Sequence, residues 1–439
     1  MIRGVNLKQI LIVLLIHLPL VTWADETPLF LYRGLRATSM GNAYEAIADD
    51  LSAVHYNPAG LTQIEKVSFQ FLPVRGWFTQ DILDEALGMT EFMSEVVTPL
   101  TGSSNPLVDP SLAGARTKLV DQVTSLSSKH LGTKVDFVGL GLSIPLVNKQ
   151  MALGLSLYLQ TLADFRIVKR GLPWPDPILQ ILDDHVIYRA TFQGAFATSL
   201  AYRLDVDKPY IKTVHFGTTA RLIGRGEASD VDNPFAVSDL LNPDRFAEEY
   251  FSLGSGEDIT SLIERQFGYS IDFGTIITPL EGLNLGVAGR NLVGGIGGNT
   301  FPPNVAVSAA VRPLILLEME NKLVDVTLAT TWDNPNGDDM LGGYALDQYT
   351  DNIHLGAEVR ILPDGWVEIG LRAGNNQGFA TFGADLRLLK FLHIEAARYS
   401  NLQSDWWVGF SVSVVFRDHR VSFRESTGSL QESGGCFEK

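Results

Sequence analysis

The fold is indicated by the stretch Trp406-Trp407-Val408-Gly409-Phe410-Ser411-Val412-Ser413-Val414-Val415-Phe416. Every even-numbered residue in this stretch is apolar, whereas the odd-numbered positions from 409 to 413 are glycine or serine. Successive side chains of a β-strand point to opposite faces, so a period of two predicts a strand. One wholly apolar face predicts that this face contacts an apolar environment along its whole length.

The same alternation recurs in about fourteen segments of roughly ten residues, a dyad repeat typical of membrane-spanning strands. We predict strands at 67–78, 135–146, 150–162, 187–203, 210–224, 266–278, 283–292, 303–313, 322–332, 352–361, 365–374, 378–388, 391–400 and 405–416. Their opposite faces combine glycine, serine and threonine with charges of both signs, which suits a crowded and hydrated barrel interior where acids and bases pair. The predicted lumen charges are Glu358, Arg360, Glu368, Arg372, Asp385 and Arg387.

Composition separates this reading from its main alternative, a soluble two-layer β-sandwich. The outer faces of a sandwich should carry lysine, glutamate and threonine, yet only 19% of the residues are charged, below the roughly 25% of ordinary soluble domains. One cysteine excludes a disulfide scaffold, and a net charge of −16 argues against nucleic-acid binding. After residue 24 no stretch has 18 consecutive apolar residues, which excludes a bundle of membrane helices. We therefore predict an all-β fold, a transmembrane antiparallel β-barrel.

The connections between the predicted strands alternate in length. Short turns such as 147–149 and 389–390 alternate with long loops at 79–134, 163–186, 225–265 and 333–351. Outer-membrane barrels have short periplasmic turns and long extracellular loops, so we predict the bacterial cell outer membrane. Residues 1–24 have the features of a cleaved signal peptide, and 417–439 is expected to be a periplasmic tail. Trp366, Trp406 and Trp407 lie near predicted strand ends, where aromatic girdles are expected.

Residues 25–65 do not alternate, and they contain the most specific motif of the chain. It consists of Ser39-Met40-Gly41-Asn42-Ala43, Ala46-Ile47-Ala48-Asp49-Asp50 and Asn57-Pro58-Ala59-Gly60-Leu61. Gly41 permits backbone conformations closed to other residues, and Pro58 biases Asn57 toward an extended conformation. The motif resembles the N-terminal signature of the FadL family, outer-membrane transporters of long-chain fatty acids and aromatic hydrocarbons. The residues that carry the resemblance are Gly41, Asn42, Asp49, Asp50, Asn57, Pro58 and Ala59.

The resemblance implies that residues 25–65 form a plug, or hatch, inside a fourteen-stranded barrel. It implies that a hydrophobic ligand meets an apolar groove of the loops and then a pocket near the plug's N-terminus. A shift of the plug then releases the ligand sideways through a gap in the wall. The candidate ligand-binding residues are Phe30, Tyr32, Arg33, Arg36, Leu83, Leu87, Phe92, Met93, Phe246 and Phe251. For the loop residues the alternative is packing of the loops on one another, and for the arginines it is salt bridging.

Two functions remain open, because similar motifs occur in related barrels that serve protein secretion. The first is a channel for passive uptake of hydrophobic small molecules, and the second is a secretion or surface-assembly component. We expect no enzyme, since no Gly-x-Ser-x-Gly elbow or exposed triad is evident. We also expect no cofactor and no metal site. The expected partners are a hydrophobic small-molecule ligand and outer-membrane lipid, with no nucleic acid, and the protein is expected to be a monomer.

Overall fold

The computed structural model describes sixteen stretches of the chain and leaves all other residues undescribed. The described residues are 34–64, 66–82, 93–101, 109–126, 129, 131–146, 149–168, 184–208, 210–229, 235–236, 264–301, 303–319, 323–333, 353–363, 365–400 and 406–417.

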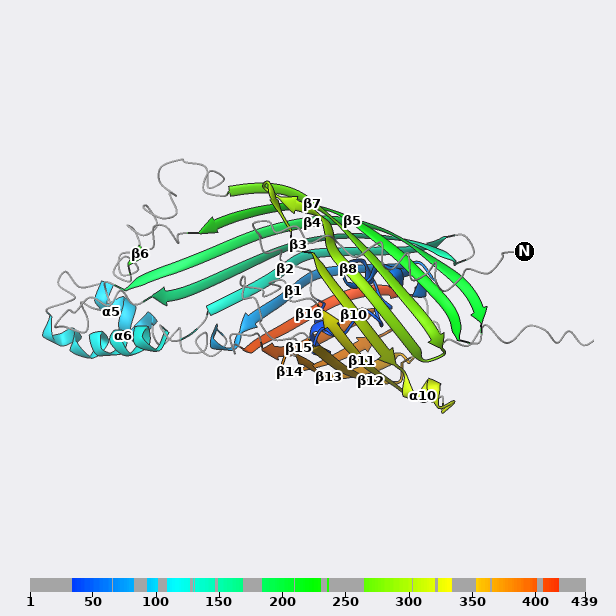
Figure 1. Cartoon of the computed structure of the whole chain (residues 1–439). Coiled ribbons are helices and arrows are strands. Elements are labelled where there is room, and N and C mark those ends of the chain that lie inside the picture. Colours follow the sequence, from blue (N-terminus) through cyan, green and yellow to red (C-terminus); the bar gives the residue numbers. More distant parts are fainter. Residues whose placement is uncertain are drawn as a thin grey trace, which may run out of the picture.

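Fourteen long antiparallel strands close into a barrel (Figure 1). They are β1 (Ser68–Thr79), β2 (Leu131–Leu146), β3 (Met151–Val168), β4 (His185–Lys208), β5 (Ile211–Ser229), β7 (Glu264–Leu280), β8 (Leu283–Ile296), β10 (Asn304–Val311), β11 (Val324–Asp333), β12 (Ile353–Ile361), β13 (Val367–Asn376), β14 (Phe379–Leu388), β15 (Leu392–Ser400) and β16 (Trp406–Arg417). The two-residue strands β6 (Phe235–Ala236) and β9 (Asn299–Thr300) pair with β4 and β8. Pairing of β1 with β16 closes the ring. The predicted all-β antiparallel barrel of about fourteen strands is confirmed.

The alternation seen in the sequence separates the outside of the barrel from the inside. In β16, Phe410 and Val412 are exposed on the outer face, while Ser411 and Ser413 are buried. In β13, Leu371 is exposed and Arg372 is buried. Because closure hides one face of every strand, the apolar side chains left outside form a belt suited to lipid.

One aromatic assignment from the sequence is wrong. Trp407 was expected in an outer girdle, but its exposed fraction is 0% and it points into the barrel. Neighbouring residues of a strand face opposite sides, so Trp407 lies on the face of Ser411 and not on that of Phe410. Trp366, the residue directly before β13, is 69% exposed. The side chain of Trp406 lies outside the described residues.

Several strands are longer than predicted. β3 continues to Val168, β5 continues to Ser229 and β7 begins at Glu264, all within ranges expected to be loops. These extensions lie where the sequence predicted the long connections between strands. Figure 1 shows β2–β5 and β7 reaching beyond β12–β15, toward helices α5 (Thr98–Thr101) and α6 (Ala113–Leu126). One half of the barrel wall is therefore much taller than the other.

Short helices complete the described part of the chain. At the tall end lie η2 (Met93–Val97) and η3 (Pro110–Leu112) beside α5 and α6, and α10 (Pro313–Leu316) lies at the opposite end (Figure 1). The buried residues of α6 are Leu119 and Val123. Among the described residues, no helix is both long enough and apolar enough to cross a bilayer.

Residues 34–64, here named the inner segment, pack inside the ring of strands (Figure 1). The segment contains α2 (Leu35–Ser39), α3 (Ala53–Tyr56) and η1 (Pro58–Gln63). Its small residues meet alanines of the wall in one buried cluster. Glycines of the wall allow the closest approach, since a Cβ on Gly274 would lie 1.9 Å from the Asn57 Oδ1. Small side chains on both surfaces let the segment fill the lumen at close packing.

Candidate functional site

The motif residues Gly41 and Asn42 form a tight reversal after α2. Both have a φ of 64°, in the left-handed region that glycine and asparagine tolerate best. The reversal presents the Gly41 carbonyl oxygen to the His354 Nδ1 of β12 at 2.7 Å. The Asn42 Nδ2 donates to the Asn376 Oδ1 of β13 at 3.1 Å. These contacts fix the first half of the inner segment to the short wall.

The second half of the motif is held by Asn57. Its backbone is extended, with a φ of −153°, as the following proline favours. Its side-chain oxygen accepts from the Ala59 N–H at 3.2 Å and so caps η1. The Nδ2 donates to the carbonyls of Glu45, at 3.0 Å, and Thr275, at 3.3 Å. One buried amide therefore ties two turns of the inner segment to β7.

Arg36 of α2 is the centre of a buried network of charges. Its Nε and Nη2 donate to the two carboxylate oxygens of Glu358 at 2.9 and 2.7 Å, a bidentate pair. Its Nη1 donates to Asp49 at 2.6 Å. Glu358 also accepts from the Arg372 Nε at 2.8 Å and lies 3.3 Å from the Arg360 Nε. Three arginines thus surround one buried carboxylate.

The network continues along β13–β15. Arg372 also pairs with Asp385, which lies 2.9 Å from the His393 Nε2. Arg387 donates to Glu368 at 2.9 Å. We name the set Arg36, Asp49, Glu358, Arg360, Arg372 and Asp385 the charge cluster. All six predicted lumen charges lie inside the barrel, and every one of them is paired with a neighbour.

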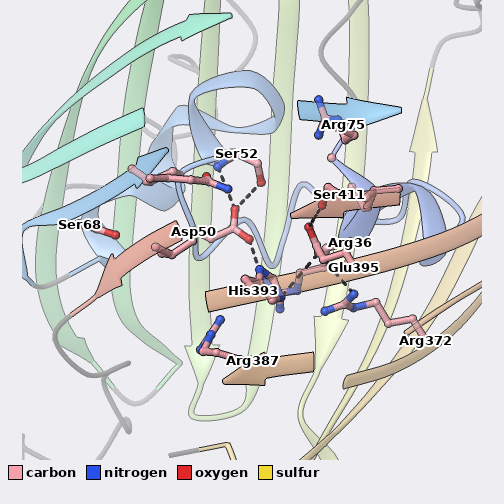
Figure 2. Close-up of a pocket in the computed structure, with 16 residues that line it drawn as sticks. Arg36, Asp50, Ser52, Ser68, Arg75, Arg372, Arg387, His393, Glu395 and Ser411 are labelled. Atoms are coloured by element: carbon pink, nitrogen blue, oxygen red, sulfur yellow. Dashed lines mark hydrogen bonds and ion pairs between the residues drawn. The ribbon is translucent and has the colours of Figure 1, made fainter. Parts of the chain in front are cut away.

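A polar cavity of about 60 Å³ lies against the charge cluster, between α2 and strands β1 and β13–β16. Figure 2 shows Arg36, Arg372, His393 and Glu395 around it, with Asp50 and Ser52 of the inner segment on the other side. A cavity of this size and polarity holds roughly four water molecules. Charged and polar side chains therefore surround a small cavity in the lumen near the short turns.

The opposite end of the lumen is aromatic. Trp77 lies near the end of β1, Tyr399 near the end of β15 and Trp407 near the start of β16, at the end of the barrel that also carries the long loops. The Tyr399 ring centroid is 5.1 Å from that of Trp77, edge to face, and 6.4 Å from that of Trp407, stacked. Leu35 of α2 and Leu162 of β3 pack with them. We name these five residues the aromatic cluster.

The aromatic cluster is fully buried yet contains a free polar group. Among the described residues, the Nε1–H of Trp77 has no hydrogen-bond partner, although Trp77 is only 1% exposed. A buried donor without a partner is unfavourable. Sequence analysis missed this cluster, and its signal was large aromatic residues on the otherwise small, polar faces of the strands.

The pairing of the wall strands is irregular near the inner segment. The β1–β16 register shifts between Phe71 and Val74, and the β2–β3 register shifts between Phe137 and Gly139. Pro73, in the first of these bulges, has no N–H to donate to a neighbouring strand. A cavity of about 20 Å³ lies at this level and is lined by His55 of α3 and by Gly139 and Gly141 of β2. Bulges in the adjacent strands β1 and β2 therefore interrupt the regular pairing of the wall at this level.

Most candidate ligand-binding residues cannot be placed. Phe30, Tyr32, Arg33, Leu83, Leu87, Phe92, Phe246 and Phe251 lie outside the described residues, as does the side chain of Met93. Arg36 is described, and its guanidinium is engaged by carboxylates of the protein itself. The described residues contain no cluster of three or more side chains suited to a metal ion.

The fold and the lumen define a fourteen-stranded transmembrane β-barrel filled by its own N-terminal segment. Solved structures similar to it include the toluene transporter TbuX of Ralstonia pickettii, with 11% identity and a TM-score of 0.48 over 89% of this chain and 99% of that chain. The P. putida toluene transporter TodX has 12% identity and a TM-score of 0.47, over 89% of this chain and 99% of that chain. The CymD monoaromatic hydrocarbon channel has 9% identity and a TM-score of 0.46, over 90% of this chain and 99% of that chain.

These three solved structures are FadL-family hydrocarbon channels. No protein-family model matches the chain, and no curated protein matches it. With identities and TM-scores this low, the function has to follow from the chain's own residues.

Proposed function

We propose that this protein is an outer-membrane channel for the passive uptake of hydrophobic small molecules, either long-chain fatty acids or aromatic hydrocarbons. The observation that carries the proposal is the aromatic cluster. A water-filled pore has no use for two buried tryptophans and a tyrosine that face inward beside the extracellular loops. Apolar ligands gain on the order of 0.8 kcal/mol for each buried CH₂ group in such an environment.

The unpaired Nε1–H of Trp77 supports a ligand with an acceptor atom, such as a carboxylate. A fatty acid would satisfy this donor, whereas a simple hydrocarbon would use only the rings. The comparison of the two ligand classes therefore separates the two versions of the proposal.

We further infer that the inner segment blocks the lumen between the aromatic cluster and the periplasm, so that a bound ligand must leave sideways. The bulges of β1 and β2 support an exit at this point, because few ladder hydrogen bonds need to break there. The cavity lined by His55, Gly139 and Gly141 lies between the inner segment and these bulges. A small shift of α3 would open it toward lipid.

The test is uptake of radiolabelled oleate and toluene by vesicles that contain the full-length protein. Trp77→Ala and Trp407→Ala should lower the initial rate of uptake about tenfold, since both remove ligand contacts. Trp332→Ala is the matched control, because Trp332 is an exposed tryptophan on the outer face of β11. Its rate should stay at the wild-type value.

Wild-type vesicles that take up neither ligand faster than empty vesicles would overturn the proposal. That result would favour the other candidate, a secretion or surface-assembly component. Equal loss of uptake in the Trp332 control would assign the effect to folding and would also remove the support for the aromatic cluster.

A further inference from the structure

One side of the barrel rim that carries the short turns has several exposed apolar side chains, with Glu318 among them. The connection from β10 to β11 contains the run Pro313-Leu314-Ile315-Leu316-Leu317, which forms α10 and its C-terminal end. Leu316, Leu317 and Met319 are exposed, with Leu317 at 64%. Turns that lie in water are normally polar.

The next two turns around the ring share this character. Leu362, after β12, and Leu389, after β14, are exposed and have φ values of 55° and 53°. This conformation is normally occupied by glycine or asparagine in turns. The Leu362 N–H donates to the Leu323 carbonyl at 2.8 Å, which joins the second turn to the base of β11. We name Leu316, Leu317, Met319, Leu323, Leu362 and Leu389 the apolar rim.

The apolar rim is continuous with the outer belt of the barrel. The Leu389 N–H donates to the Trp366 carbonyl at 2.8 Å. The Trp366 ring lies 5.9 Å from the Lys390 Nζ, a pair suited to the membrane–water interface. Beyond them, Phe391 stacks on Phe416 with ring centroids 6.1 Å apart, and both are on the outer face.

Strand length explains why the rim lies so close to lipid. β12 and β15 have nine residues each, about 30 Å along the strand, which a barrel tilt reduces to about 23 Å. The apolar band of an outer-membrane barrel is about 25 Å tall. These strands leave no surplus, so their turns fall at the edge of the band. The long strands β3–β5 end in turns with exposed charges, Lys149 and Lys208.

We propose that the apolar rim is inserted into the phospholipid leaflet on the turn side of the membrane. The occupant of this surface is lipid, because the surface continues the lipid-facing belt and carries its kind of side chain. The short half of the barrel then sits deeper in the leaflet, while the turns that carry Lys149 and Lys208 stay in water. This proposal concerns the seating of the barrel and is independent of the proposed uptake.

The test measures depth with nitroxide labels in the full-length protein. Cys436→Ser removes the natural cysteine, and single cysteines then replace Leu317 or Leu389, with Lys149→Cys and Lys208→Cys as controls. The labelled proteins are reconstituted in phosphatidylethanolamine–phosphatidylglycerol vesicles. The ratio of collisions with oxygen to collisions with a water-soluble nickel complex should be several-fold higher at the two leucine sites than at the two lysine sites.

Equal, water-like ratios at all four sites would overturn the proposal. So would a rim label that is open to nickel in pure vesicles but protected in native outer membranes, since a protein partner would then cover the rim. Heat-modifiable electrophoretic mobility confirms that each labelled protein is a folded barrel before the measurement.

Discussion

The aromatic cluster and the charge cluster share one helix. Leu35 packs with Trp77 and Tyr399, whereas the next residue, Arg36, pairs with Glu358 and Asp49. At the end of the barrel that carries the long connections, the contacts of α2 are apolar and without fixed direction. At the end that carries the short turns, they include the bidentate charge pair between Arg36 and Glu358, which has a fixed geometry. The difference indicates that α2 is anchored on one side and adaptable on the other.

The largest effect should come from the centre of the charge cluster. Glu358→Leu leaves Arg36, Arg360 and Arg372 buried around a missing carboxylate. Breaking a buried ion pair by removing one partner lowers the free energy of unfolding by about 3–5 kcal/mol. Urea unfolding in vesicles, followed by tryptophan fluorescence, measures the change.

The double variant Arg36→Met/Glu358→Leu serves as the control for this prediction. It removes one of the unpaired charges and should recover part of the loss. A loss below about 1 kcal/mol in Glu358→Leu would show that the charge cluster does not anchor α2.

The next largest effect should come from disturbing the contact between the inner segment and the wall. Gly274→Val places a side chain where the Asn57 amide lies, since even a Cβ would be 1.9 Å from its oxygen. The overpacking should cost about 2 kcal/mol and displace η1. Vesicles should then become permeable to small sugars in a swelling assay. Gly224→Val is the matched control, because its Cβ would lie 3.6 Å from the nearest atom, on Phe267.

A smaller change should disturb the aromatic cluster while keeping all of its rings. A Cβ on Gly409 would lie 2.2 Å from the Trp77 ring. Gly409→Ala should therefore tilt that ring and cost about 1 kcal/mol in unfolding free energy. Uptake of an apolar ligand should fall. The free energy of unfolding of Gly409→Ala in urea should nevertheless be equal to or higher than that of the charge cluster variants. Unchanged uptake would mean that the ring position is not important for the ligand.

The smallest effect concerns His55, which lies outside the membrane-spanning strands. Burial, followed by the charges of Arg221 and Arg75, lowers the pKa of His55 well below its usual value. The folded protein therefore keeps His55 neutral, whereas the unfolded chain binds a proton below a pKa of about 6.5. The contribution of His55 to stability is full above that pH and decreases as the pH falls toward the folded pKa.

Between pH 7 and pH 6 the loss from His55 should be less than about 1 kcal/mol. His55→Gln removes this contribution, so the difference between wild type and variant over this interval is the quantity to measure. A variant with the same pH dependence as the wild type would contradict a neutral His55. The result would distinguish two kinds of buried basic side chain in the lumen. The arginines of the charge cluster keep their charge in the folded protein, whereas His55 is neutral there.

The sequence alone determined the barrel. Lipid on one side of every strand imposes a period of two, and this local pattern predicted the strands and which residues of β12–β14 face the lumen. The motif at residues 39–61 could be found because glycine, asparagine and proline are required by local backbone geometry. It indicated an unusual, non-strand segment without naming its contacts.

Only the tertiary structure decided how the lumen is divided. Arg36 and Glu358 are 322 residues apart in the chain, and no periodicity connects them. Trp77, Tyr399 and Trp407 come together because β1 pairs with β16 when the ring closes. The ends of β3–β5 extend beyond the short strands β12–β15, and only the folded barrel shows how far they continue. Contacts made by closure depend on register and ring size, which are properties of the whole barrel rather than of any one segment.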